Sequence, residues 1–186
     1  MPPSKSSFLK AICIVILIIA IPSCKKNESL EMVNSKYVLT KNSEEIEAYF
    51  FIATANVTKL IISKSQLAQH KSVKNTIKDV SIKIENNQNL LLQEINKIAV
   101  KKLIIINEIN STVTREDLYE LVDKGEVSFD KSYINSIIKS LSEQIELFES
   151  ISKETEDMEV LNLVVHYLPK QYEFLREAKK IKKEIN

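Results

Sequence analysis

Few side chains in this sequence of 186 residues suit metal, nucleophilic or acid–base chemistry, and they are far apart. The chain has two histidines, His70 and His166, and two cysteines, Cys13 and Cys24. A carboxylate di-iron centre in a helical bundle needs Glu three residues before its histidines, but leucine stands at both of those positions. Two cysteines are too few for a cysteine-based zinc site. The sequence therefore predicts no metal ligand and no cofactor.

Catalytic residues are equally hard to find. Neither histidine is paired with a nucleophile by any recognisable context, and one glycine is too few for a phosphate-binding loop. Asp130 and Tyr133 look like a motif pair, but helix capping by the aspartate and core packing by the tyrosine explain both. We therefore expect no catalytic site and no enzymatic activity.

The composition favours long helices. The chain contains one glycine, Gly125, and four prolines, and few helix breakers argue against many turns. Its 26 basic and 25 acidic residues give a net charge of +1. A nucleic-acid-binding domain normally has a clear basic excess, so no nucleic acid partner is expected.

The N-terminus has the three parts of a secretory signal. Lys5 and Lys10 precede an apolar run over 11–21, which is shorter than the roughly 20 residues that span a bilayer. The run ends at Ser23 and Cys24 and then turns polar. This boundary resembles a bacterial lipoprotein signal, which implies that Cys24 is acylated after cleavage. The alternatives are a plain secretory signal or a short membrane anchor.

These features predict three regions. Residues 1–23 form the signal peptide, 24–42 form a flexible tether, and 43–186 form a helical domain. Lipidated Cys24 would hold that domain at a membrane, because several acyl chains give stable attachment.

Four segments within 43–186 carry apolar residues at helical spacing. The first begins at Asn42-Ser43 and lasts to about His70. The second runs from Ser72 to Ala99, with Asn87 on its apolar stripe. The third and fourth lie between Ser128 and Ile181. Their expected stripes are Ile134, Ile138, Leu141, Ile145 and Phe148, and then Met158, Leu161, Val165, Leu168, Tyr172 and Leu175.

The connections are less regular. Leu103–Ile106 is predicted to be an extended segment packed on the bundle, and the alternative is an exposed strand edge that docks a partner. Thr114–Val122 is expected to form a short extra helix that stops at Gly125. Asn87 either fixes the register between helices or marks a wet position. Pro169 is expected to kink the fourth helix.

Three short motifs resemble an uncharacterised family of bacterial predicted outer-membrane proteins. They are Phe129-Asp130-Lys131-Ser132-Tyr133, Leu147-Phe148-Glu149 and Leu168-Pro169. The resemblance implies a ferritin-like four-helix fold. It also implies histidines on three helices, but the matching positions here hold Lys83-Ile84, Leu141 and Phe174. Isoleucine, leucine and phenylalanine offer no lone pair to a metal. A plainly hydrophobic core is therefore expected.

The sequence thus predicts an all-α, up-down-up-down, ferritin-like four-helix bundle anchored by Cys24 in the cell envelope. The resemblance favours the outer membrane, on its periplasmic or its outer face. The expected role is structural or protein-binding, with an undetermined oligomeric state. The alternatives are a ferritin-like metal-binding, redox or stress protein, and a carrier of a small apolar ligand.

Overall fold

A computed structural model describes residues 28–106, 118–119, 121–122 and 125–185, and of residues 28–42, 126 and 127 only the backbone. The chain divides into two compact units, Met1–Leu39 and Thr40–Asn186. The first unit is described only as the helical backbone of residues 28–39. The second unit contains the packed helices on which the following sections concentrate.

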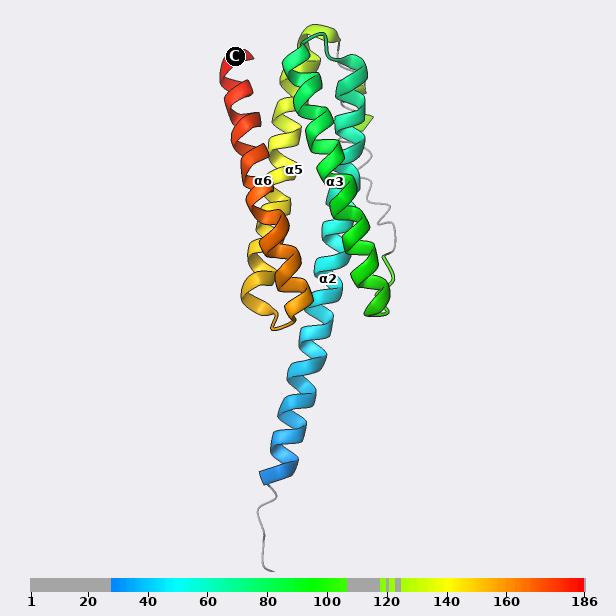
Figure 1. Cartoon of the computed structure of the whole chain (residues 1–186), viewed down its shortest axis with the longest axis vertical. Coiled ribbons are helices and arrows are strands. Elements are labelled where there is room, and N and C mark those ends of the chain that lie inside the picture. Colours follow the sequence, from blue (N-terminus) through cyan, green and yellow to red (C-terminus); the bar gives the residue numbers. More distant parts are fainter. Residues whose placement is uncertain (1–27, 107–117, 120, 123–124, 186) are drawn as a thin grey trace, which may run out of the picture. The chain divides into compact units, whose positions relative to one another are not determined.

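The predicted all-α bundle is confirmed. Four long helices pack against one another, and the described residues contain no strand. Helices α3 and α5 run in the same direction, and α2 and α6 run the opposite way (Figure 1). The α2–α3 turn, the start of α5 and the end of α6 lie at one end of this unit. The expected up-down-up-down order is therefore wrong at α5, because the segment between α3 and α5 returns the chain to the end at which α3 begins. The helices are α2 (Glu28–Lys71), α3 (Asn75–Lys101), α5 (Glu126–Glu154) and α6 (Met158–Ile185).

Three helix boundaries differ from expectation. Helix α2 begins at Glu28, and not at the expected start Asn42-Ser43. Gly125 is the N-cap of α5 with φ −66°, and not a helix stop in a left-handed conformation. Asp130 therefore lies inside α5, and its predicted capping role is wrong. Of the expected short helix before α5, residues 118–119 and 121–122 are helical, and the rest lies outside the described residues.

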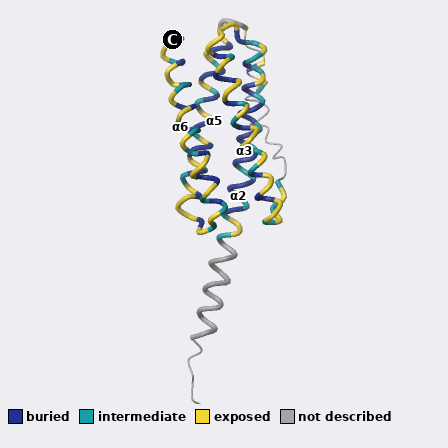
Figure 2. The backbone as a smooth tube through the Cα atoms, in the orientation of Figure 1, coloured by how far each residue is buried: buried dark blue, intermediate teal, exposed yellow. Residues whose placement is uncertain are grey.

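Buried and exposed residues alternate along each helix of the second unit (Figure 2). The buried hydrophobic residues form two clusters along the bundle. One cluster joins the C-terminal half of α2 to the start of α5 and the end of α6, and it includes Phe129 and Ile181. The other contains Phe50 and Phe148, whose rings pack edge to face at 5.5 Å. Ile134, Leu141, Ile145 and Phe148 are buried, as the α5 stripe predicts.

The predicted stripe of α6 is wrong in register. Met158 and Val165 are 67% and 74% exposed, whereas the face that packs inward carries other residues. Two rows of apolar residues run side by side on this helix. The row that packs into the core was not predicted, because Gln171 interrupts its apolar pattern. The buried residues are Val160, Leu163, Val164, Tyr167, Gln171, Phe174, Leu175, Ala178 and Ile181.

Helix α3 ends in a tight turn built on a leucine. Leu103 has φ 58°, the left-handed region that usually favours glycine. Its backbone N–H donates to the Val100 carbonyl at 3.1 Å, and the Ile104 N–H donates to the Ala99 carbonyl at 2.8 Å. This pair of bonds is the Schellman arrangement at a helix C-terminus.

The turn settles the conformation of the Leu103–Ile106 segment. Ile104 and Ile106 are partly buried against the second cluster, as the packing prediction requires. Leu103 and Ile105, however, are exposed. The segment therefore packs through alternate residues, and Leu103 itself is not extended.

The segment Ser43–Lys71 is long and apolar enough to cross a membrane by length and composition. However, 44% of its most apolar window is buried inside the bundle. Its apolar residues thus serve as one wall of the core.

Candidate functional site

A layer of glutamines crosses the middle of the bundle. Gln88 on α3, Gln144 on α5 and Gln171 on α6 are fully buried. Gln88 Nε2 donates to Gln144 Oε1 at 2.9 Å and to Gln171 Oε1 at 2.7 Å. Gln144 Nε2 donates back to Gln88 Oε1 and to Thr58 Oγ1 on α2, both at 2.8 Å. The layer therefore contacts all four helices and satisfies its own amides.

Asn87 is not the interior residue of α3. It is half-buried beside the layer, where its Oδ1 accepts a hydrogen bond from Gln171 Nε2 at 3.1 Å. The buried position belongs to Gln88, the next residue in the chain. The role expected of Asn87, which was to fix the register between helices, would therefore belong to Gln88.

A second set of buried polar groups lies nearer the α2–α3 turn. Lys64 is fully buried and its Nζ donates to Ser140 Oγ at 3.0 Å. Tyr133 shares a 2.9 Å hydrogen bond with Ser81. Burial raises the pKa of the Tyr133 phenol, against the hydrogen bonds to serine that lower it. The tyrosine is therefore neutral at physiological pH and acts as a hydrogen-bonding core residue.

Two polar atoms, Thr54 Oγ1 and Asp130 Oδ1, are buried without partners among the described residues. An unpaired buried oxygen costs about 1–3 kcal/mol, so these positions weaken the fold.

The expectation of a plainly hydrophobic core is therefore half right. Ile84, Leu141 and Phe174, which stand where the family resemblance implies histidines, are fully or almost fully buried. However, Lys64 and the three glutamines are also buried, in helical turns close to these apolar residues. Apolar and polar layers therefore alternate along the interior of the bundle.

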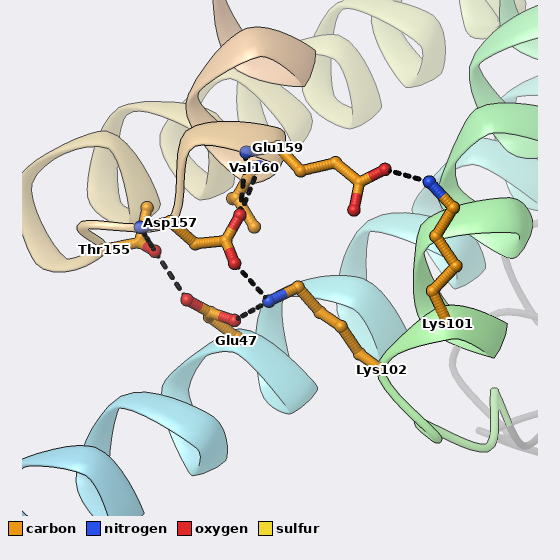
Figure 3. A network of polar contacts seen from close by, with 7 residues as sticks. All are labelled: Glu47, Lys101, Lys102, Thr155, Asp157, Glu159 and Val160. Carbon is orange, nitrogen blue, oxygen red and sulfur yellow. Dashed lines mark hydrogen bonds and ion pairs between the residues drawn. The ribbon is translucent and has the colours of Figure 1, made fainter.

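An ionic network closes the end of the unit at which α3 ends and α6 begins (Figure 3). Lys102 Nζ donates to Glu47 Oε2 at 2.7 Å and to Asp157 Oδ2 at 2.6 Å. Thr155 Oγ1 donates to Glu47 Oε1 at 2.6 Å. Lys102 thereby ties α2, the end of α3 and the start of α6 together.

Asp157 also caps α6, as its place before the helix predicts. Its Oδ1 accepts the backbone N–H groups of Glu159 at 2.7 Å and Val160 at 3.1 Å. The Lys102 hydrogen bond and these backbone bonds lower the Asp157 pKa, against a smaller opposing effect of burial. Burial lowers the pKa of Lys102, but its bonds to Asp157 and Glu47 outweigh that effect and raise it.

The surface has three recesses near this end, and one of about 500 Å³ is lined by residues of the ionic network and its neighbours, Glu44, Glu45, Glu47, Ala48, Lys102 and Ile104. The other two are smaller. One, of about 340 Å³, lies between α2 and α5 and is lined by Ile46, Tyr49, Phe50, Leu147 and Ile151, with Glu45 and Glu154 at its edge.

The other recess, of about 360 Å³, contains His166 together with Glu94, Glu159 and Tyr167. His166 is exposed, and its ring packs edge to face on Tyr167 at 4.7 Å. No three His, Cys, Asp or Glu side chains within the described ranges come close enough to hold a metal ion. The site predicted at Cys24 lies outside the described residues.

The glutamine layer is the feature that sequence reasoning missed. Each glutamine falls in step with a buried apolar residue, three or four positions from Ile84, Leu141 or Phe174. The sequence signal was that each of the three glutamines has the helical spacing of an apolar stripe. No buried role was predicted for them because polar residues usually face solvent.

The comparisons with known proteins agree with this architecture. No curated protein matches the sequence significantly. The solved structure described as "CopM in the Cu(II)-bound form" matches with a TM-score of 0.66 and 14% sequence identity, covering 76% of this chain and 97% of that chain. At this identity the likeness shows the fold alone. A family model described as "Domain of unknown function (DUF4142)" matches residues 40–181. The helical bundle described above therefore belongs to the DUF4142 family.

Proposed function

We propose that this protein is a non-enzymatic envelope lipoprotein whose helical bundle works through its outer surface, as a structural or protein-binding module. The observation that carries the proposal is the filled interior. Hydrophobic side chains occupy the positions where histidines are implied, and the three buried glutamines bond to one another and to Thr58. A core arranged in this way holds the helices in place, which suits a module that works through its surface.

The anchor is the acylated Cys24. A positively charged start, a short apolar run and a small residue before the cysteine support it. Mass spectrometry of the protein from membranes should find Cys24 as the first residue, carrying acyl chains. Cys24→Ser should release the protein from membranes, whereas Cys13→Ser should leave it anchored. A full-length chain that retains residues 1–23 would contradict the anchor.

The surface best suited to a protein partner is the apolar recess between α2 and α5. Tyr49 at this recess is 68% exposed and lies beside buried Phe50. Aromatic residues of this kind are common in protein–protein contacts. The acidic edge at Glu45 and Glu154 would favour a partner segment that carries positive charge as well as apolar residues.

Site-specific photo-crosslinking tests this assignment. A photoreactive side chain in place of Tyr49 should give discrete adducts in intact cells. The matched control replaces Val165, which is equally apolar and 74% exposed on α6, away from the recess. Equal adducts at both positions, or none at either, would count against a specific partner here.

Copper binding is the second candidate function. The fold is similar to a protein solved in a Cu(II)-bound form, and one surface recess here is lined by His166, Glu94 and Glu159, although the three side chains are too far apart to hold an ion as they stand. Imidazole and carboxylate are suitable Cu(II) ligands. Titration with Cu(II), followed by electron paramagnetic resonance, decides between the two functions. Stoichiometric binding that His166→Ala abolishes would establish the copper function and displace the structural one.

A further inference from the structure

The two ends of the second unit carry opposite charge among the described residues. Exposed acids gather at the end at which the chain enters the unit, including Glu44, Glu45, Glu154 and Glu156. The α2–α3 turn, the start of α5 and the end of α6 form the other end (Figure 1), and its exposed lysines make it basic. We call it the basic end and define it by Lys74, Lys131, Lys179, Lys180, Lys182 and Lys183.

The elements that carry these lysines meet in one cluster of the core. Ile77 of α3, Phe129 of α5, and Ala178 and Ile181 of α6 are buried together. The lysines near them in the sequence therefore belong to one surface, and all except the half-buried Lys182 are exposed.

Helix stabilisation does not explain this distribution. Lysines in the last turns of α6 suit the negative end of its dipole. Lys74, however, lies at the N-terminal end of α3, where the dipole disfavours a cation. It occupies the N-cap itself and makes no side-chain cap bond, and the first turn of α3 has no acid. Lysines therefore stand at a helix start as well as at a helix end on this surface.

Nearby acids neutralise little of this charge. Glu177 is paired with Lys83, whose Nζ lies 3.1 Å from Glu177 Oε1. Lys83 is not one of the six lysines that define the basic end. Glu184 lies 4.0 Å from Lys180 Nζ, and both side chains are exposed, so the pair is weak. The α2–α3 turn also projects Val73, which is 65% exposed and directly precedes Lys74. An exposed apolar side chain on a surface that carries exposed lysines suits a partner that is anionic outside and apolar beneath.

We propose that the basic end binds an anionic phospholipid bilayer. The lysines would lie among the headgroups, and Val73 would reach toward the acyl region. Each lysine near an anionic membrane strengthens binding about fivefold, so several together give useful affinity at moderate ionic strength. The proposal does not depend on acylation of Cys24, because the chain enters the unit at the other end.

Vesicle flotation of the full chain tests the proposal. The vesicles contain phosphatidylcholine alone or phosphatidylcholine with phosphatidylglycerol. Flotation with the neutral vesicles measures the contribution of the N-terminal region. The additional binding to anionic vesicles measures the basic end, so failure of the anchor and failure of this proposal give different results.

The decisive variant is Lys179→Gln/Lys180→Gln/Lys183→Gln, which changes exposed side chains only. It should lower the additional anionic binding on the order of a hundredfold. Lys97→Gln/Lys101→Gln/Lys153→Gln removes the same charge from exposed lysines nearer the acidic end and should retain most of the binding. Circular dichroism confirms that both variants remain helical.

Two results would overturn the proposal. One is equal loss in both triple variants, which would show an effect of net charge only. The other is wild-type protein that binds soluble polyphosphate but does not prefer anionic vesicles, because the partner would then be a polyanionic polymer. Binding to anionic vesicles that weakens as salt is added supports the proposal.

Discussion

Leu103 is the residue at which this chain departs most clearly from standard helix-ending chemistry. Its positive φ of 58° closes the α3 turn that positions Lys102 and Ile104. A left-handed conformation costs a non-glycine residue about 1–2 kcal/mol. The 89% exposed side chain recovers little of that cost through packing.

Leu103→Gly should therefore stabilise the protein by about 1 kcal/mol, because glycine adopts the required conformation without strain. Urea denaturation measures the change in unfolding free energy. Leu103→Ala is the matched control and should show no such gain, since alanine keeps the Cβ. An equal gain in the two variants would mean that loss of exposed apolar surface, and not backbone strain, is responsible.

Gln144 tests whether the buried amides act as one unit. Gln144→Leu should destabilise the fold by about 1–3 kcal/mol, because Thr58 and Gln88 lose their buried partner. Replacing Gln88, Gln144 and Gln171 together by leucine should recover much of this loss, since no glutamine amide is then left unpaired. Chemical denaturation compares the variants. A triple variant whose loss equals three independent losses would show that the layer is not cooperative.

The Lys102 network should make stability depend on pH in a defined direction. The Asp157 pKa is lowered in the folded protein. Its contribution is therefore fully present above the unfolded pKa near 4 and is lost as pH falls through the lower folded value. The Lys102 pKa is raised, so its contribution is present below about pH 10 and is lost above the folded value.

Asp157→Asn tests how much of the loss of stability at low pH comes from Asp157, because asparagine still caps a helix but carries no charge. Thermal melts from neutral pH to pH 2 should show a flatter loss of stability for the variant than for the wild type. Asp79→Asn, an exposed aspartate outside the network, is the control and should keep the wild-type slope. Parallel slopes for all three proteins would remove Asp157 from the acid response.

At the scale of the helix, the corrected face of α6 can be checked against the core of α5. Leu141→Ala removes a fully buried side chain and should cost about 2–5 kcal/mol. Val165→Ala should change stability by less than about 0.5 kcal/mol, because Val165 lies on the outer row. Denaturant melts compare the two. A large loss at Val165 would restore the original register of α6.

Pro169 lies inside α6, which continues from Met158 to Ile185 without interruption. Proline removes one backbone hydrogen bond and crowds the preceding turn, at a cost of about 3 kcal/mol in an undistorted helix. Pro169→Ala should therefore raise the unfolding free energy by about 1–3 kcal/mol. Asn162→Ala, at another exposed position of α6, should gain only a few tenths of a kcal/mol. A destabilised Pro169→Ala variant would mean that the bundle needs the bend that proline introduces.

The sequence predicts elements more reliably than it predicts the faces that pack. Apolar spacing and scarce breakers predict four helices in the correct order, since each stripe must be covered. The α6 face was missed because two apolar rows compete and Gln171 belongs to the inner one. The left-handed conformation of Leu103 was missed because it depends on what the turn must connect, and the residue type gives no sign of it.

For the whole molecule, the second unit behaves as a rod with an acidic base and a basic tip. Its base is the end nearest residue 40, from which the chain continues toward Cys24. If Cys24 is acylated as proposed, an anionic leaflet would repel that base electrostatically within a Debye length of about 8 Å at physiological salt. An anionic surface would thus repel one end of the second unit and attract the other.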